Sequence, residues 1–214
     1  MARLLVYTRT TGYRHASIPA GIAALRCLDG YSADATEDPA VFRASTLRDY
    51  AAIVFLSTSG EVLDAAGREA LTDYMAANGA WLGIHAASTT ECDWLWFGDL
   101  VAARFDQHPP VQAGEINVED KDHPATKHLG STWARYDEWY AFRENPRPRV
   151  HVLLTVDEAS YEGGTMGADH PIAWCHERLG GRSFYTAIGH TEESFAEPAF
   201  LRHLRGALSW LTSG

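Results

Sequence analysis

The sequence Gly79-Ala80-Trp81-Leu82-Gly83-Ile84-His85-Ala86-Ala87-Ser88 carries the clearest structural signal in the chain. An apolar run that passes directly into small residues is typical of a buried strand followed by a tight turn into a helix. In an α/β sheet such a turn holds one side chain above the carboxyl edge, and here that side chain is His85. Histidine cannot form an acyl-enzyme, so this position supports proton transfer, metal ligation or polar binding. The alternative interpretation is a structural histidine whose ring nitrogens make hydrogen bonds inside a packed turn.

Apolar runs alternate with amphipathic segments through the first half of the chain. No hairpin signal separates them, so we expect right-handed βαβ units and a mostly parallel sheet with helices on both faces. This fold class is α/β, of the flavodoxin-like or Rossmann-like type. The expected strands are 4–7, 31–36 and 51–56, and the expected helices lie between Ser17, as N-cap, and Gly30, and over 64–78.

The second half of the chain has a different pattern. Segment 111–118 alternates in polarity, and segment 150–154 is apolar. Segments 171–175 and 182–188 flank a glycine turn, which predicts a strand pair. We therefore expect antiparallel additions to the sheet here, followed by a last helix that Pro198 begins. With no repeat or linker signal, residues 1–214 are expected to form a single domain.

Composition excludes several classes of function. The 214 residues carry a formal net charge of -10, which argues against nucleic-acid or membrane partners. Neither a signal peptide nor a run of transmembrane length is present, and three widely spaced cysteines suggest no disulfide framework, so we expect a cytoplasmic protein. No G-x-G-x-x-G or G-x-x-x-x-G-K motif follows a strand, so no nucleotide cofactor is expected. The tryptophan-rich middle segment could form a lid, a homo-oligomer interface or both, and the sequence does not decide between them.

Three histidines follow predicted strands. His15 comes after the first strand, His85 lies at the elbow, and His190 follows segment 182–188. Because parallel strands end at one edge of a sheet, these side chains are expected to converge. His85 and His190 are then candidate catalytic groups, and all three histidines are candidate ligands for a divalent metal such as zinc. Glu192 lies two residues after His190 and is expected to orient its imidazole, although the acidic first turn of a helix is the simpler explanation.

A second group of residues is expected to contact the substrate. His108 precedes two prolines, and its loop could fold over the site. Glu138 is preferred to Asp137, since neighbouring strand residues point to opposite faces. Trp139 and Trp174 are core aromatics by default, but flat aromatic faces beside polar groups also suit a sugar site. With His15, the predicted substrate-binding set is His15, His108, Glu138, Trp139 and Trp174.

The chain resembles the ThuA-like (trehalose-utilisation) proteins of the class I glutamine-amidotransferase-like superfamily, over nearly its full length. In that superfamily the glutaminase triad is Cys, His and Glu, and His190 with Glu192 matches its last two members. His85 stands where the cysteine should be, so glutamine hydrolysis is not expected. The resemblance rests on Gly12-Tyr13-Arg14-His15, Gly83-Ile84-His85-Ala86-Ala87, 105–109, 137–140, His170-Pro171-Ile172-Ala173-Trp174 and Gly189-His190-Thr191-Glu192-Glu193-Ser194.

The resemblance implies a role in carbohydrate metabolism, on trehalose-like disaccharides or their keto derivatives. Sugar isomerisation, epimerisation or hydrolysis by acid–base or metal-assisted chemistry would suit the histidines. The alternative is a non-catalytic sugar-binding or regulatory module on an amidotransferase-like fold. A glutaminase that uses Cys92 as a displaced nucleophile is a remote third hypothesis.

Overall fold

A nine-stranded mixed sheet forms the centre of the computed structural model, which describes residues 1–213. Its first five strands run parallel to one another, as the βαβ pattern predicts. Four antiparallel strands extend the sheet beyond them. Across the sheet the order is β2 (Tyr31–Thr36), β1 (Ala2–Tyr7), β3 (Ala52–Leu56), β4 (Ala80–Ile84), β11 (Arg182–Thr186), β10 (Pro171–His176), β9 (His151–Asp157), β6 (Gln112–Val118) and β7 (Thr132–Asp137).

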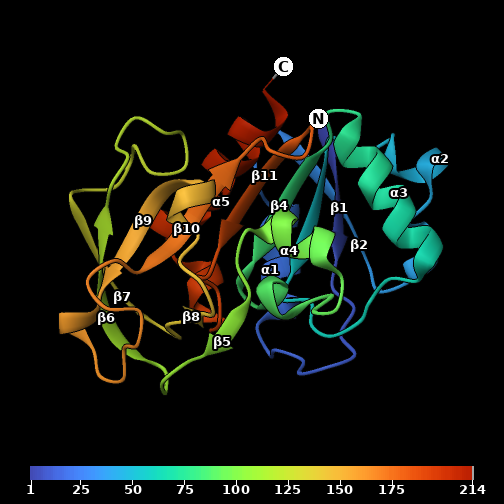
Figure 1. The fold of residues 1–214 in the computed structure, drawn as a ribbon. Helices are drawn as coiled ribbons and strands as arrows, with labels where there is room; N and C mark the ends of the chain where they lie inside the picture. Colours follow the sequence, from blue (N-terminus) through green and yellow to red (C-terminus); the bar gives the residue numbers. More distant parts are fainter. Residues whose placement is uncertain (214) are drawn as a thin grey trace.

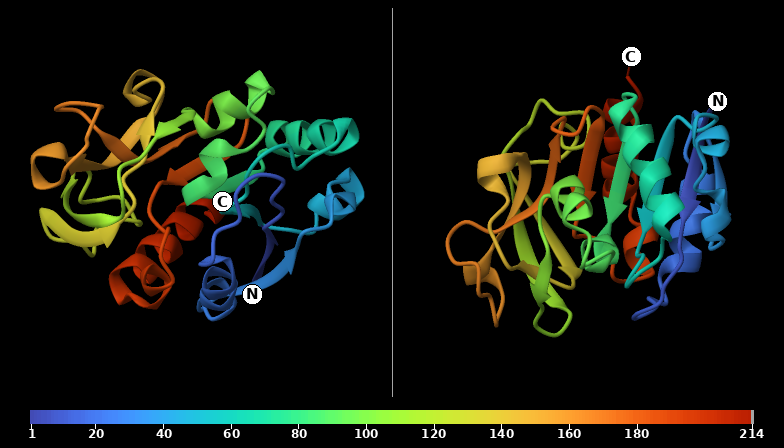
Figure 2. Two further views of the ribbon diagram at one scale, coloured as in Figure 1. Left: turned by 90° about the horizontal axis from the view of Figure 1, so that it is seen from below. Right: turned by 45° about the vertical axis from the view of Figure 1, so that its right-hand side comes forward.

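Helices cover both faces of the parallel part of the sheet. Figure 2 shows α1 (Ile18–Arg26) and α5 (Pro198–Thr212) on one face, with α3 (Ala65–Ala76) and α4 (Leu95–Val101) on the other. Every residue of β3 and β4 is buried, as expected for strands covered on both sides. The short helix α2 (Ala44–Leu47) lies near α3 at the edge of the molecule (Figure 1).

The antiparallel half carries the segments that complete the site. The predicted pair of segments 171–175 and 182–188 forms the antiparallel strands β10 and β11. A separate two-stranded sheet joins β5 (Phe105–Gln107) to β8 (Ala141–Phe142). In Figure 1 these short strands lie near the lower end of the parallel strands, which is their carboxyl end.

Ser17 does not have the capping role predicted for it. Its backbone is helical and its hydroxyl caps no amide of α1. The hydroxyl instead donates to the carbonyl oxygen of Gly189, at 3.1 Å. This bond ties the loop after β1 to the loop after β11, the two segments that carry His15 and His190. Among the helices of residues 1–213, none combines the length and apolar character that a membrane crossing requires.

Candidate active site

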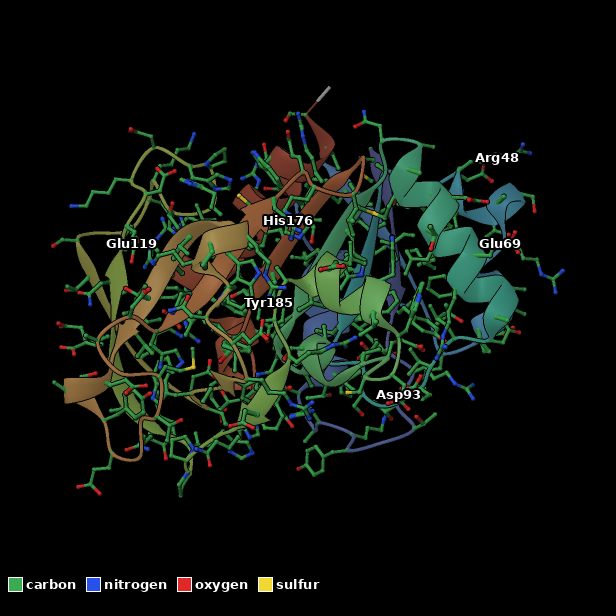
Figure 3. All side chains as sticks on the ribbon, viewed as in Figure 1. Arg48, Glu69, Asp93, Glu119, His176 and Tyr185 are labelled. Carbon is green, nitrogen blue, oxygen red and sulfur yellow. The ribbon has the colours of Figure 1, made fainter. Side chains whose placement is uncertain are left out.

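His85 sits at a strained turn directly after β4. Its φ of 52° lies in the left-handed region, and the 3₁₀ helix η2 (His85–Thr89) begins there. Small neighbours, Ala86 and Ala87, leave room for this backbone. The Tyr185 hydroxyl donates to the carbonyl oxygen of His85 at 2.8 Å and so holds the turn from β11, near the centre of Figure 3.

The tautomer of His85 follows from its hydrogen bond. The side chain is fully buried, and Nδ1 lies 2.7 Å from the carbonyl oxygen of Ala187. A carbonyl oxygen only accepts, so Nδ1 carries the proton and Nε2 carries the lone pair. A backbone carbonyl that fixes the distal nitrogen in this way is the usual support for a metal-binding histidine.

The other two histidines meet His85 at that lone pair. Nε2 of His15 lies 3.1 Å from Nε2 of His85, and Nδ1 of His190 lies 3.2 Å from it. Along the chain His15 is 70 positions and His190 is 105 positions from His85, but the strands that precede the three residues end at one edge of the parallel sheet. Burial and the neighbouring imidazoles lower the pKa of His15 to about 3, so its ring is neutral near pH 7.

Glu138, just beyond β7, adds a carboxylate to this cluster. Its Oε2 lies 3.1 Å from Nδ1 of His190 and 3.4 Å from Nε2 of His85. Burial alone would raise the pKa of Glu138, but its contacts with His190 and His85 outweigh burial and hold that pKa well below its usual range. The bond to Glu138 raises the pKa of His190 against the opposing effect of burial.

Four donor atoms, three imidazole nitrogens and a carboxylate oxygen, thus lie within 4.8 Å of one another. The single lone pair of His85 Nε2 faces two other ring nitrogens, and it can accept a hydrogen bond from only one of them. Zinc at about 2.0–2.1 Å from tetrahedral ligands places those ligands roughly 3.3–3.4 Å apart. Nε2 of His85 lies 3.1 and 3.2 Å from the other two ring nitrogens and 3.4 Å from Oε2 of Glu138, separations that are close to this value. The residues therefore fit a divalent metal.

The backbone of His190 is held by Asp137, a carboxylate that is fully buried. Oδ1 accepts from the amide of His190 at 3.1 Å, and Oδ2 accepts from the amide of Gly189 at 3.2 Å. Gly189 has a φ of 121°, which only glycine adopts easily. Arg135 lies 3.2 Å from the same Oδ2 and balances the charge. Asp137 thus positions His190 from beneath the site.

The orienting role predicted for Glu192 is not what the geometry shows. Glu192 is exposed, and within residues 1–213 its side chain makes no hydrogen bond to His190. The chain turns after His190 into the 3₁₀ helix η5 (Glu193–Ala196), which directs position 192 away from the cluster. Glu138 occupies the place beside the imidazole instead.

A cavity of about 570 Å³ opens above the cluster. This size suits a small organic ligand such as a sugar. His85 is fully buried and does not line the cavity, whereas the other members of the cluster do. The wall is formed by Gly12, Tyr13, His15, Ser59, Gly60, Ala86, Thr89, Phe105, His108, Glu138, Tyr140 and His190.

Three aromatic side chains of this wall were not assigned a role from the sequence. Tyr140 lies over His85, with ring centroids 4.3 Å apart, and Tyr13 meets His15 edge-on at 4.8 Å. Tyr13 is 70% exposed at the cavity, and Phe105 packs on Tyr140. Tyr13 and Phe105 lie in the two motifs around His15 and His108, which is the signal that could have identified them.

The two tryptophans predicted to bind substrate are core residues instead. Trp139 is 2% exposed, and its ring covers the backbone of Gly114, where a Cβ would lie 2.7 Å from the indole. Trp174 is 1% exposed, donates from Nε1 to the carbonyl oxygen of Val101 at 2.8 Å, and packs on Tyr185. Neither lines the cavity. Both rings complete the packing between the sheet and its covering segments.

Replacing Trp174 with phenylalanine will therefore affect stability but not ligand binding. Loss of the indole hydrogen bond and of part of the buried ring should lower the free energy of unfolding by about 2 kcal/mol. Urea denaturation measures this loss, and calorimetry with sugars measures binding. A loss of sugar affinity at unchanged stability would return Trp174 to the binding site.

Comparisons with known proteins agree with this architecture. The family model described as "ThuA: Trehalose utilisation" matches residues 3–211. A ThuA-like protein from Bacteroides uniformis is 27% identical, with a TM-score of 0.81 over 98% of this chain and 91% of that one. One from Parabacteroides merdae is 19% identical, with a TM-score of 0.83 over 100% and 90%. A cytoplasmic protein from Salmonella typhimurium shares the fold at 12% identity and a TM-score of 0.68, over 99% of each chain. No curated protein matches the chain.

Proposed function

The chain belongs to the ThuA family, whose description is trehalose utilisation, and from this premise we propose that it is a metal-dependent enzyme of carbohydrate metabolism. The metal is a divalent ion such as zinc, held by His15, His85 and His190. The substrate is a trehalose-like disaccharide or a keto derivative of one. One of the structural neighbours is named as a cytoplasmic protein, and this supports a cytoplasmic location for the present chain.

The convergence of three imidazole nitrogens on one point is the observation that carries this proposal. The lone pair of His85 is fixed toward that point by Ala187, and His15 is neutral near pH 7. Neutral imidazoles are good ligands for zinc, and a hydrogen bond at the distal nitrogen, which His85 makes, orients the ring. Three protein ligands with one open position are the usual arrangement in catalytic zinc sites, and a metal held by these histidines would be next to the cavity that His15 and His190 line.

The cavity above the metal suits a sugar. A bound divalent ion polarises a carbonyl or hydroxyl oxygen of the substrate. Glu138 lies on the cavity side of the cluster and can accept a hydrogen bond from a sugar hydroxyl. Tyr13 and Phe105 offer apolar faces against which a sugar ring can pack. Isomerisation, epimerisation and hydrolysis are the reaction types open to this set of groups.

To test the function, the conversion of trehalose and of its keto derivatives is compared between metal-loaded and chelator-treated protein. We expect conversion of at least one of these sugars by the loaded protein, with little conversion after chelation and recovery when zinc is restored. Sugar binding without conversion in the loaded protein would favour a non-catalytic binding module, which the absence of a nucleophile at position 85 also allows. Equal conversion with and without metal would contradict the metal's role.

A further inference from the structure

His108 is a histidine of the cavity wall that the metal cluster does not use. Its Nδ1 lies 3.0 Å from Oε1 of Glu138 and 3.0 Å from the carbonyl oxygen of Pro109. Both neighbours accept hydrogen bonds, so Nδ1 carries the proton and the lone pair is on Nε2. Within residues 1–213, Nε2 has no hydrogen-bond partner. The ring therefore presents an unused basic nitrogen.

The position of the ring leaves that nitrogen accessible. His108 stacks on Tyr140, with ring centroids 5.7 Å apart and ring planes at 26° to each other. The centroid of its ring also lies 5.8 Å from that of Phe105. Its side chain is 39% exposed and lines the cavity. Two prolines follow it and restrict the backbone on that side. The imidazole is thus supported on one face while one edge stays open to a ligand.

Glu138 joins His108 to the three-histidine cluster. Its two carboxylate oxygens face opposite ways, Oε1 toward His108 and Oε2 toward His190 and His85. Both carboxylate oxygens of Glu138 are therefore already engaged by imidazole nitrogens. A carboxylate of this kind orients an imidazole and stabilises its protonated form, as in carboxylate–histidine pairs of hydrolases. Nε2 of His108 is, within residues 1–213, the nitrogen of this pair of side chains that has no partner and can face a ligand in the cavity.

We propose that His108 is the general base and general acid of the cavity, and that its substrates are sugars with a carbonyl group beside a C–H bond. This inference rests on the proposed function, since the carbonyl oxygen is placed at the three-histidine site. Nε2 of His108 takes the proton from the carbon next to the carbonyl. The C–H bond breaks and an N–H bond forms, while its electron pair becomes a C=C bond and the carbonyl oxygen takes the negative charge. Return of a proton to carbon reverses these changes, so no oxidant or reductant is required.

The experiment follows the exchange of that hydrogen for deuterium. A keto derivative of trehalose is incubated in D₂O with wild-type protein, and NMR records the loss of the signal of the proton beside the carbonyl. His108→Ala should keep its zinc content and melting temperature but lose exchange by at least about 100-fold, the usual contribution of a general base. Added imidazole should restore part of the rate by occupying the vacated space. His151→Ala, at an exposed histidine on β9, is the matched control and should exchange as wild type does.

The outcomes separate this inference from the function on which it rests. Exchange in His108→Ala within twofold of wild type would overturn the role of His108. Wild-type protein that binds zinc but exchanges nothing above the protein-free rate would overturn enolisation as the reaction and leave the metal site standing. Wild-type protein that neither binds zinc nor exchanges hydrogen would overturn the metal-dependent function itself.

Discussion

His85→Ala will lose its metal and, with it, turnover. The variant deletes the one imidazole whose lone pair faces both His15 and His190. Changes to groups that merely support a ligand cost 10–100-fold in affinity, so removal of the ligand should weaken zinc binding by more than about 100-fold. Mass spectrometry of protein purified without an affinity tag should find about one zinc per wild-type chain and almost none in the variant.

Two controls make this result specific to the cluster. His203→Asn alters a histidine that is also fully buried but belongs to the buried face of α5, and it should keep its zinc. His85→Gln keeps a polar side chain at the turn and should lose zinc as the alanine variant does. If His85→Ala retained a full equivalent of zinc, the metal would lie elsewhere and the three-histidine site would be wrong.

The parallel half of the fold was predictable because its strands are covered on both faces. Segments such as β3 and β4 read as continuous apolar runs, and each is bounded by a polar loop that marks its carboxyl end. That regularity also placed His15, His85 and His190 at one edge. The sequence could not show their contact distances, since these depend on the left-handed turn at His85 and on the hydrogen bond to Ala187.

The contribution of the antiparallel half was harder to predict. Glu138 reaches the cluster from the end of β7, which is the far edge strand of the nine, and no local pattern reports that approach. Glu192 was preferred as the orienting carboxylate because it is close to His190 in sequence, but the turn into η5 removes it. Trp139 and Trp174 are of a residue type that is common in sugar sites. Only their low exposed fractions in the structure show that they pack in the core.

Asp137→Asn should cause the largest loss of stability. The buried carboxylate accepts from the amides of Gly189 and His190 and from the hydroxyl of Ser194, and it faces Arg135. Asparagine has the same shape, but its NH₂ group is a hydrogen-bond donor and would face one of the donors that the carboxylate now accepts from. The substitution also removes the negative charge that balances Arg135. Breaking a buried pair by neutralising one partner costs about 3–5 kcal/mol, which urea denaturation should measure.

Asp169→Asn is the matched control for this variant. Asp169 also pairs with an arginine, Arg147, but both side chains are 41% exposed, so its neutralisation should cost no more than about 1 kcal/mol.

Asp137→Asn should in addition weaken zinc binding by about 10–100-fold, because the backbone that carries His190 loses its anchor. Equal stability of the two variants would mean that water or Glu197 satisfies Arg135 without Asp137. Weakened zinc binding at full stability would limit Asp137 to the positioning of His190, so the two measurements together distinguish its structural role from its role at the site.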